Sequence, residues 1–384
     1  MPPGRVRSRR LRILFIGPLP EPVTGHSLAC RILLDALVLH HEVRVVNLSK
    51  ASFGGGVTSI GRIAEVATIL RQVWGASGSV DVVYLTISES IAGNLKDLLI
   101  YLLCWRRLPQ TVIHLHGGSI RSHLFDRYPI LRSANAVFLR RIGAAIVLGR
   151  SHLAIFDGLV PQARQHIVAN FAQDYLFADL PAIQAKFTDT RVLHLLFLGN
   201  LIDGKGHHDL LIGYQRLPEA SRKRVRLHFA GAFESAEESA GFLRSIGADE
   251  AVTYHGVVGG EAKRALLAAA HILVLPSSLS EGQPISILEA YAAGCVVMAT
   301  ASGGIPDIFA GDVNGYAIQP NAPDTVRDAI ARALDGSATL EQIARQNWVT
   351  ASGRYRTADY TSRVTARIED VADARLSPSE TGTD

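Results

Sequence analysis

The chain has 384 residues, of which 48% are hydrophobic and 19% are charged, with 34 glycines. This composition excludes a disordered or fibrous protein, and the length predicts two α/β domains of roughly 150–200 residues each. The net charge of +4 conceals an excess of nine positive charges in residues 1–190 and of five negative charges in residues 191–384.

Cysteine usage and hydropathy exclude further classes. Cys30, Cys104 and Cys295 are scattered through apolar segments without a CxxC pair, so we expect reduced core residues in a cytosolic protein. No stretch reaches the roughly 20 apolar residues of a membrane span. Nucleic-acid binding is not expected, because the basic residues of the first half are not interleaved with aromatic ones.

The first half alternates short apolar strands with helical patterns, which favours a mainly parallel sheet. The strands predicted there are residues 11–16, 43–47, 80–85, 111–116 and 144–148. The loop GPLPEPVTGHS follows the first strand and leads into a helix at 28–39, with Thr24 or Ser27 as N-cap. Such a loop suits a phosphate or a sugar, and a purely structural loop is the alternative. It matches neither GxGxxG nor the P-loop.

Two other features of the first half stand out. The run LLIYLLCWRR at 98–107 predicts a buried helix or, as the alternative, one that contacts a membrane surface. His114 and His116 lie on one face of a strand, but a metal site there would need a third ligand, and none is near in the sequence. We expect His116, next to two glycines, to be a hydrogen-bonding site residue and His114 to be a structural neighbour.

The domain boundaries follow from a loss of apolar strands after residue 172. We predict a first domain at 11–175, a linker at 176–190, a second domain at 191–350, a helix at 351–375 that crosses back to the first domain, and a disordered tail at 376–384. The strands predicted in the second half are residues 191–198, 226–230, 252–255, 272–275 and 296–299.

Residues 271–307 contain the strongest functional pattern. A buried strand ends at Pro276, a polar turn carries Glu281, and a helix that begins near Pro284 carries Glu289. Because ligands gather at the carboxyl ends of parallel strands, and carboxylates repel anions, we expect both glutamates to bind sugar or ribose hydroxyls. A glycosidase pair is disfavoured, since one of them lies inside a helix. Lys205, between two glycines after another strand, can bind a diphosphate; a solvated loop lysine is the alternative.

These motifs resemble those of the retaining glycosyltransferases of family four, which have the GT-B fold. GNLIDGKGHHDLL is similar to the family's G-R-L-x-x-x-K-G loop, and EGQPISILEA to its E-x7-E motif. GPLPEPVTGHS, LHG and IVAN are weaker matches in the first half. The resemblance implies an α/β fold of two Rossmann-like α/β/α domains that face each other across a cleft.

The resemblance also implies individual roles. Lys205 would bind the diphosphate, Glu281 would bind the donor sugar and His116 would lie near the reacting carbon, and these three are the expected catalytic residues. Glu289 would bind the ribose, and backbone groups would provide most other donor contacts. The expected donor-binding residues are Gly25, Asn200, Gln283, Ile285, Ser286, Glu289 and Val257.

The implied activity is transfer of a sugar from a UDP- or GDP-sugar to a glycan or lipid-linked acceptor, with retention and without metal or cofactor. Cell-surface polysaccharide or glycolipid synthesis is the expected context. The expected location is cytoplasmic, and the basic first half either contacts an anionic membrane or solubilises helix surfaces.

The sequence departs from the family pattern at two positions. Asn200 stands where the family usually has Arg and cannot neutralise a diphosphate. Either another basic residue such as Arg121 or Arg150 substitutes, or the donor geometry differs, or the activity is weakened. Pro284 lacks one backbone donor. Two alternatives stay open: a catalytically weak GT-B-like binding subunit, and a sugar-nucleotide epimerase, which would need acid and base residues in the cleft.

Overall fold

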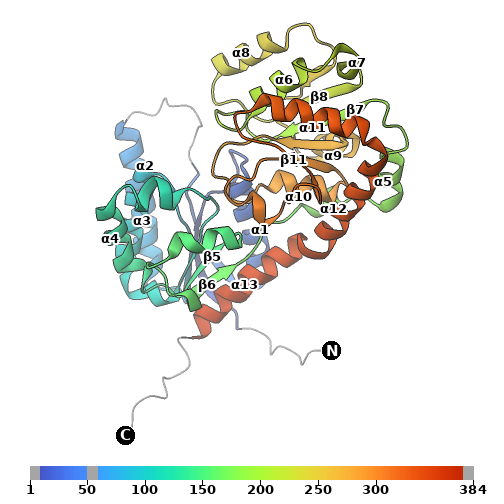
Figure 1. Ribbon diagram of the computed structural model, residues 1–384. Helices are drawn as coiled ribbons and strands as arrows, with labels where there is room; N and C mark the ends of the chain where they lie inside the picture. The colour runs from blue at the N-terminus through green and yellow to red at the C-terminus, as the bar shows by residue number, and fades with distance from the viewer. Residues whose placement is uncertain (1–8, 50–58, 375–384) are drawn as a thin grey trace, which may run out of the picture. The chain divides into compact units, whose positions relative to one another are not determined.

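The computed structural model describes residues 9–49 and 59–374 and divides the chain into two compact units (Figure 1). The first unit contains the chain up to Ala169 and again from Tyr360, and the second is Asn170–Asp359. Each unit is built on one six-stranded sheet, with parallel pairing throughout. The predicted pair of Rossmann-like α/β units is confirmed.

The sheet of the first unit has the order β2-β1-β3-β4-β5-β6. Its strands are β1 (Arg12–Gly17), β2 (Glu42–Asn47), β3 (Val82–Thr86), β4 (Thr111–His114), β5 (Ala144–Val147) and β6 (Gln165–Ile167). Its α-helices are α1 (Gly25–Val38), α2 (Ser59–Ser77), α3 (Ile91–Leu103), α4 (Pro129–Leu139) and most of α13 (Thr357–Asp373). Shorter helices are η1 (Trp105–Gln110), η2 (Arg121–Phe125), η3 (Arg150–Phe156) and η4 (Gln162–Arg164).

The sheet of the second unit has the order β12-β11-β10-β7-β8-β9. Its strands are β7 (Leu193–Leu198), β8 (Val225–Ala230), β9 (Val252–Tyr254), β10 (Ile272–Leu275), β11 (Val296–Ala299) and β12 (Gly315–Ala317). Its α-helices are α5 (Leu180–Lys186), α6 (His207–Gln215), α7 (Glu219–Arg222), α8 (Ala236–Ile246), α9 (Gly260–Ala269), α10 (Ile285–Ala292), α11 (Pro323–Asp335) and α12 (Leu340–Arg354). Shorter helices are η5 (Asp174–Leu176), η6 (Ile305–Asp307) and η7 (Ser337–Thr339).

Central strands are apolar along their whole length, while edge strands are not. Every residue of β3, β4, β5, β10 and β11 is buried, because helices cover both faces of a parallel sheet. The edge strand β2 leaves charged residues in water. The core of the first unit joins residues of β1, β3, β4 and β5 to apolar side chains of α2 and α3.

In both sheets the strand order reverses beside the first strand of the unit. β1 lies between β2 and β3, and β7 lies between β8 and β10. In open α/β sheets a ligand crevice forms outside the carboxyl ends of the strands at this reversal. The loops after β7 and β10 are therefore the place to look for a site in the second unit.

The structure refines several predicted element bounds. α1 begins at Gly25, three residues before the prediction, because Thr24 and Ser27 cap it reciprocally at 3.0 and 2.8 Å. The strands β6 and β12 were not predicted, since three residues are too few to show a period. The predicted linker contains α5, with Asp179 as its N-cap. The predicted tail at 376–384 lies outside the described residues.

Candidate functional site

Loops that follow neighbouring strands meet at the carboxyl edge of the second sheet. The Gly204 carbonyl, after β7, accepts hydrogen bonds from the backbone N–H and the hydroxyl of Ser278, after β10, at 2.8 and 3.1 Å. Gly206 has a φ of +83°, and a Cβ there would lie 2.2 Å from the Pro276 carbonyl oxygen. The glycine-lysine-glycine sequence is thus needed for the close approach of these two loops.

Lys205 and Glu281 are brought together in this place. The Lys205 Nζ donates to both carboxylate oxygens of Glu281 at 2.8 Å, and the Ser277 hydroxyl donates to Oε1 at 2.5 Å. The lysine side chain is 22% exposed and the glutamate side chain 10%. The pair is accessible enough to contact a ligand and is held in place by the surrounding loops. It offers a cation and a carboxylate side by side, which suits a phosphate next to a hydroxyl group.

Glu289 has a lysine partner of its own. Lys263, on α9, donates from Nζ to the Glu289 Oε1 at 2.6 Å and to the Gln173 side-chain oxygen at 3.1 Å. Burial raises the pKa of Glu289, while the ammonium of Lys263 acts in the opposite direction and favours the carboxylate. Sequence analysis missed Lys263, because a lysine within the pattern GEAKRALLAA gives no indication that it points toward another element.

The N-terminus of α10 carries the remaining predicted donor contacts of this loop. The Gln283 side-chain oxygen accepts the Asn170 backbone N–H at 2.6 Å, and the Asn170 amide nitrogen donates to the Gln283 carbonyl at 2.8 Å. Pro284 is the N-cap. The backbone amides of Ile285 and Ser286 belong to the first turn and have no acceptor within the helix, so they are available to an anion or a hydroxyl.

Asn200 and Val257 lie at the same edge of the second sheet, further toward β9. Asn200 comes two residues after the end of β7, and Val257 is 70% exposed in the loop after β9. Because β7, β8 and β9 are parallel neighbours, both positions are at their carboxyl ends. All the predicted site residues of the second unit therefore share one edge, while their individual roles stay predictions.

In the first unit, His116 is part of a stack of imidazoles. Its ring centroid is 4.0 Å from that of His114 and 4.4 Å from that of His26, which follows Gly25 at the start of α1. Burial lowers the pKa of His116 well below its usual value, and lowers the pKa of His114 to about 3. The Tyr84 hydroxyl fixes His114 by a 2.7 Å hydrogen bond to Nδ1. His116 is thus a neutral hydrogen-bonding group and not a cation at physiological pH.

Glu89 is a second residue that sequence analysis missed. Its Oε1 accepts the backbone N–H groups of Ser119 at 2.6 Å and of Ile120 at 2.9 Å. A Cβ at Gly117 would lie 1.7 Å from its Oε2, so the glycine after His116 makes room for this carboxylate. The only hint in the sequence is the acidic residue in the SES turn after a predicted strand.

The two arginines considered as substitutes for a family arginine both belong to the first unit. Arg121 begins η2, where its guanidinium donates to the Ala154 carbonyl and lies 3.5 Å from the Asp126 carboxylate. Arg150 is exposed and begins η3. Arg121 therefore already has two partners within its own unit.

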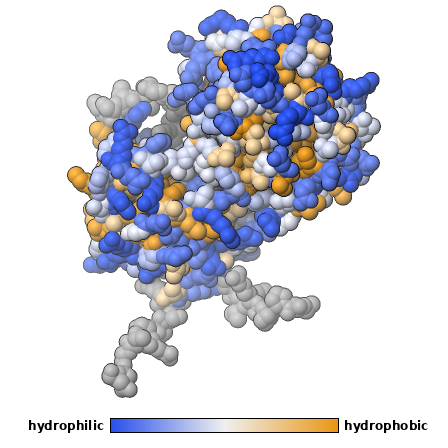
Figure 2. All heavy atoms as spheres, in the orientation of Figure 1, coloured by the Kyte–Doolittle hydropathy of each residue, from blue (hydrophilic) through white to orange (hydrophobic). Residues whose placement is uncertain are grey.

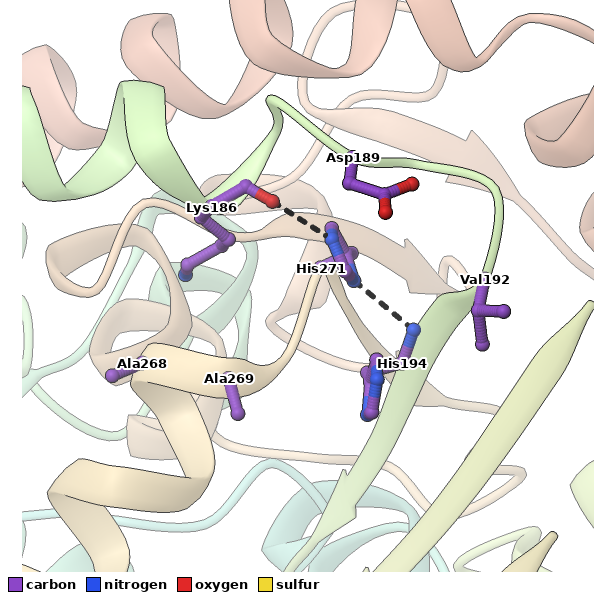
Figure 3. Close-up of a pocket in the computed structure, with 7 residues that line it drawn as sticks. All are labelled: Lys186, Asp189, Val192, His194, Ala268, Ala269 and His271. Atoms are coloured by element: carbon purple, nitrogen blue, oxygen red, sulfur yellow. Dashed lines mark hydrogen bonds between the residues drawn. The ribbon is translucent and has the colours of Figure 1, made fainter.

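A separate pocket of the second unit lies at the opposite edge of the sheet. Figure 3 shows His271 with its ring bonded to the Lys186 carbonyl and to the backbone N–H of His194, both at 3.0 Å. His271 precedes β10 and His194 is near the start of β7, so this pocket is at the amino ends of these strands. The Lys186 ammonium donates to the carbonyl of Ala293 at 2.7 Å, near the end of α10. No predicted site residue lines the pocket, and these contacts hold the fold together.

Comparison with known proteins decides the class of the second unit. Residues 181–349 match the family described as glycosyl transferases group 1. This part of the chain is a group 1 glycosyl transferase domain. The match spans both the Lys205 loop and the E-x7-E segment, so the predicted resemblance is confirmed for this domain.

Two curated relatives share the glycosyl transferase domain over part of their length. An uncharacterized glycosyltransferase of Methanocaldococcus jannaschii is 30% identical over 149 residues, which are 39% of this chain and 37% of the relative. A GDP-mannose-dependent alpha-(1-6)-phosphatidylinositol monomannoside mannosyltransferase of Mycobacterium tuberculosis is 29% identical over 171 residues, which are 42% of this chain and 43% of the relative. The matches span less than half the length of either relative.

A solved structure extends the likeness of fold to both units. HepE of Anabaena, in complex with UDP and glucose, superposes with a TM-score of 0.70 at 17% identity, and the match covers 94% of this chain and 100% of HepE. At 17% sequence identity, the similarity shows a shared fold and nothing about function. The predicted GT-B architecture of two Rossmann-like units is confirmed, with the group 1 glycosyl transferase domain as the second of them.

Proposed function

We propose that the chain transfers a sugar from a UDP- or GDP-sugar to a hydroxyl group of a glycan or lipid-linked acceptor, with retention and without metal or cofactor. The observation that carries this proposal is the double lysine-glutamate arrangement of the glycosyl transferase domain. Lys205 holds Glu281 and Lys263 holds Glu289, both at the carboxyl edge of the sheet. A nucleotide sugar offers the matching groups, namely a diphosphate, a sugar and a ribose diol.

In the proposed reaction these residues bind and stabilise the donor. The Lys205 ammonium balances the charge that grows on the leaving diphosphate, which is where preorganised charge lowers a barrier most. Glu281 accepts a hydroxyl of the donor sugar, and Glu289 accepts the ribose diol. The free amides of α10 add donors to the phosphate or sugar. The departing phosphate takes the acceptor's proton on the same face, so no protein nucleophile is required for retention.

A binding screen followed by a turnover assay tests the proposal. The full chain is titrated with UDP-, GDP- and ADP-sugars by calorimetry, with GDP-mannose among them because one relative is named as dependent on it. We expect one nucleotide class to bind, and to release its nucleoside diphosphate when an acceptor glycolipid is added. Absence of binding to every nucleotide sugar would contradict the proposal.

The same assay separates the two alternatives. A binding subunit without catalysis, which Asn200 motivates, would bind a donor and release no nucleoside diphosphate with any acceptor. An epimerase would convert the sugar of the donor in the absence of an acceptor. Both are distinguished from a transferase by analysing the products of a single incubation.

We further infer that the acceptor is membrane-linked and that the first unit makes the membrane contact. The supporting observation is an exposed apolar stripe on α3. Ile91, Leu95, Leu99 and Leu102 are 43%, 48%, 44% and 58% exposed, and their spacing of three and four residues places them on one helix face. The opposite side of α3 packs Ile100 and Tyr101 into the core. One face of the apolar run is therefore buried in the core, and its exposed face supports the proposed membrane contact.

The neighbouring helix α4, which packs on α3, and the segments beside it add exposed apolar residues and a cation. On α4, Ile130 is 85% exposed and Val137 is 54% exposed. The Arg141 guanidinium lies over the Trp105 ring at 4.2 Å, an arrangement of aromatic and cationic groups that suits a membrane interface. Figure 2 shows hydrophobic side chains between hydrophilic ones on the part of the surface that belongs to α3 and α4. Within the described residues, no helix is long and apolar enough to cross a membrane.

A further inference from the structure

Three potential metal ligands converge in the first unit. His26 and Cys30 are four residues apart on α1, so their side chains lie on the same face of the helix one turn apart. His116 comes from the loop after β4. One imidazole nitrogen of each histidine and the Cys30 sulfur all lie within 4.8 Å of one another. No further ligand lies near His116 in the sequence, but the fold brings His26 and Cys30 next to it.

Within the described part of the chain, the two imidazole ligands each have a buried ring nitrogen without a partner, while the Cys30 thiol interacts with the Thr86 side chain. The Nε2 atoms of His26 and His116 are buried and have no hydrogen-bond partner among the described residues. Buried polar atoms are almost always paired, so orphaned ring nitrogens in stacked imidazoles need an explanation, and an ion is one. In His114, the third ring of the stack, Nδ1 is bonded to the Tyr84 hydroxyl, but Nε2 is likewise without a partner among the described residues.

The ligand types suit a metal that binds nitrogen and sulfur. A neutral imidazole has a lone pair to donate, and an incoming cation must displace the proton of the Cys30 thiol. The Lys96 ammonium acts on His26 and opposes a cation at this place, so the thiolate has to offset part of the metal's charge.

We propose that His26, Cys30 and His116 form a binding site for Zn²⁺ with one open coordination position. Two imidazoles and a thiolate are typical zinc ligands, whereas Mg²⁺, Ca²⁺ and Mn²⁺ prefer oxygen. Zinc bond lengths separate tetrahedral ligand atoms by roughly 3.5 Å, so rotation of these side chains has to close the site by about 1 Å. The open position takes water or an anion.

A consequence for activity rests on the proposed function. If His116 contacts the donor sugar, zinc on its ring removes that contact, and zinc inhibits transfer until a chelator removes it. The metal site itself is independent of this role, because its evidence is the geometry of three side chains. Zinc binding without inhibition would leave the site standing and would contradict the role of His116.

Cobalt replacement tests the site on the full chain. We expect one Co²⁺ per chain to produce the thiolate-to-cobalt charge-transfer band in the near ultraviolet, and Zn²⁺ to abolish it by displacement. Cys30→Ser and His26→Ala should weaken Co²⁺ binding about 100-fold or more, since even outer-sphere partners of a metal cost about 10–100-fold. Cys295→Ser is the matched control, because this cysteine is also buried but belongs to the second unit and is not part of the cluster.

The folding of each variant is checked separately, so that a lost cobalt band can be assigned to loss of a ligand and not to unfolding. Circular dichroism and the metal-free melting temperature show whether each variant is folded, and zinc should raise the melting temperature of the wild type and of Cys295→Ser only. A wild type that gives no band and no zinc-dependent shift would overturn the proposal. So would a band that persists in folded Cys30→Ser or is lost in Cys295→Ser. His26→Ala carries the test if the buried Cys30→Ser variant does not fold.

Discussion

Lys263 and Glu289 form a buried ion pair at the carboxyl edge of the second sheet, with Nζ 2.6 Å from Oε1 and side chains only 12% and 4% exposed. A carboxylate this deep cannot be solvated by bulk water, so the lysine keeps it charged for a ligand. The same lysine also bonds Gln173, which holds its ammonium in position. Glu289 is therefore prepared to accept hydroxyls, and its removal affects two properties at once.

We predict that Glu289→Ala raises the donor KM and lowers kcat/KM about 10–100-fold, because the ribose diol loses a charged acceptor. It should also destabilise the domain by about 3 kcal/mol, since Lys263 is left buried without its partner. Glu261→Ala is the control on the same helix as Lys263: its side chain is 78% exposed and pairs with Arg264, so stability should change by less than about 0.5 kcal/mol. Wild-type donor binding by calorimetry in Glu289→Ala would remove this residue from the site.

Lys205→Ala should abolish most transfer and leave the fold intact. The variant loses the cation next to the leaving diphosphate, an effect worth about 3 kcal/mol or roughly 100-fold in kcat. Lys223→Ala, at a lysine that is 74% exposed in an i,i+4 pair, should transfer at the wild-type rate. Normal turnover by a folded Lys205→Ala variant would refute the phosphate assignment.

Asn200→Arg complements Lys205→Ala, because it adds a positive charge near the proposed diphosphate position where Lys205→Ala removes one. If the neutral side chain limits the rate, the arginine should raise kcat, because it adds a second charge for the diphosphate. Unchanged or lower activity would mean that another residue already neutralises the diphosphate.

Transfer should continue in EDTA. The proposed donor site combines lysines, glutamates and backbone amides. The Glu281 and Glu289 carboxylates are each bonded to a lysine, which leaves them poor ligands for Mg²⁺ or Mn²⁺. If zinc contaminates the purified protein at His26 and Cys30, EDTA should raise the rate. Complete loss of activity in EDTA that manganese restores would contradict the prediction.

Much of this arrangement could be predicted from the sequence, since strands and their loops are local features. The apolar runs placed Lys205 and Glu281 in loops that follow strands, and parallel pairing then put both loops at one edge of the sheet. Lys263 could not be found in this way, because the direction of a helical side chain is set by packing against other elements. The same holds for His26 and Cys30, which the sequence separates from His116 by more than 80 residues.

Acid should destabilise the second unit between about pH 6.5 and pH 4. Burial lowers the pKa values of His228 and His271 to about 4 in the folded state, below the usual 6.5 of an unfolded chain. Above pH 6.5 both states are neutral and stability is complete. As the pH falls, the unfolded state binds protons first, so each histidine removes up to about 1.4 kcal/mol per pH unit until the folded state titrates near pH 4.

The hydrogen bonds of His228 make it the residue to replace. Its two ring nitrogens bond His194 at 3.0 Å and His255 at 3.1 Å, and Arg226 adds a nearby positive charge that opposes protonation. His228→Gln should flatten the fall in melting temperature between pH 6.5 and 4, while the exposed His123→Gln should leave it unchanged. An equally steep fall in His228→Gln would show that other groups cause the acid sensitivity.

The membrane inference leads to the last prediction: the protein should float with anionic liposomes at low salt. Leu95, Leu99 and Leu102 offer apolar side chains to the acyl boundary, and the basic residues that border α3 and α4 are attracted to anionic headgroups. Each basic residue near the surface contributes about 1 kcal/mol, and salt screens that attraction but not the apolar contact. Liposome binding should therefore weaken in high salt, and the part that depends on apolar contact should remain.

Two variants separate these contributions. Leu99→Ser with Leu102→Ser should reduce flotation at every salt concentration, because both side chains are exposed on the same face of α3 and the core on the other face is untouched. Arg106→Ala with Arg140→Ala should reduce flotation at low salt only, since it removes the screened term. Val349→Ser is the control: this valine is 55% exposed, but it lies on α12 of the second unit. A wild-type protein that stays with the soluble fraction at low salt would overturn the membrane inference and leave the transferase proposal to its own tests.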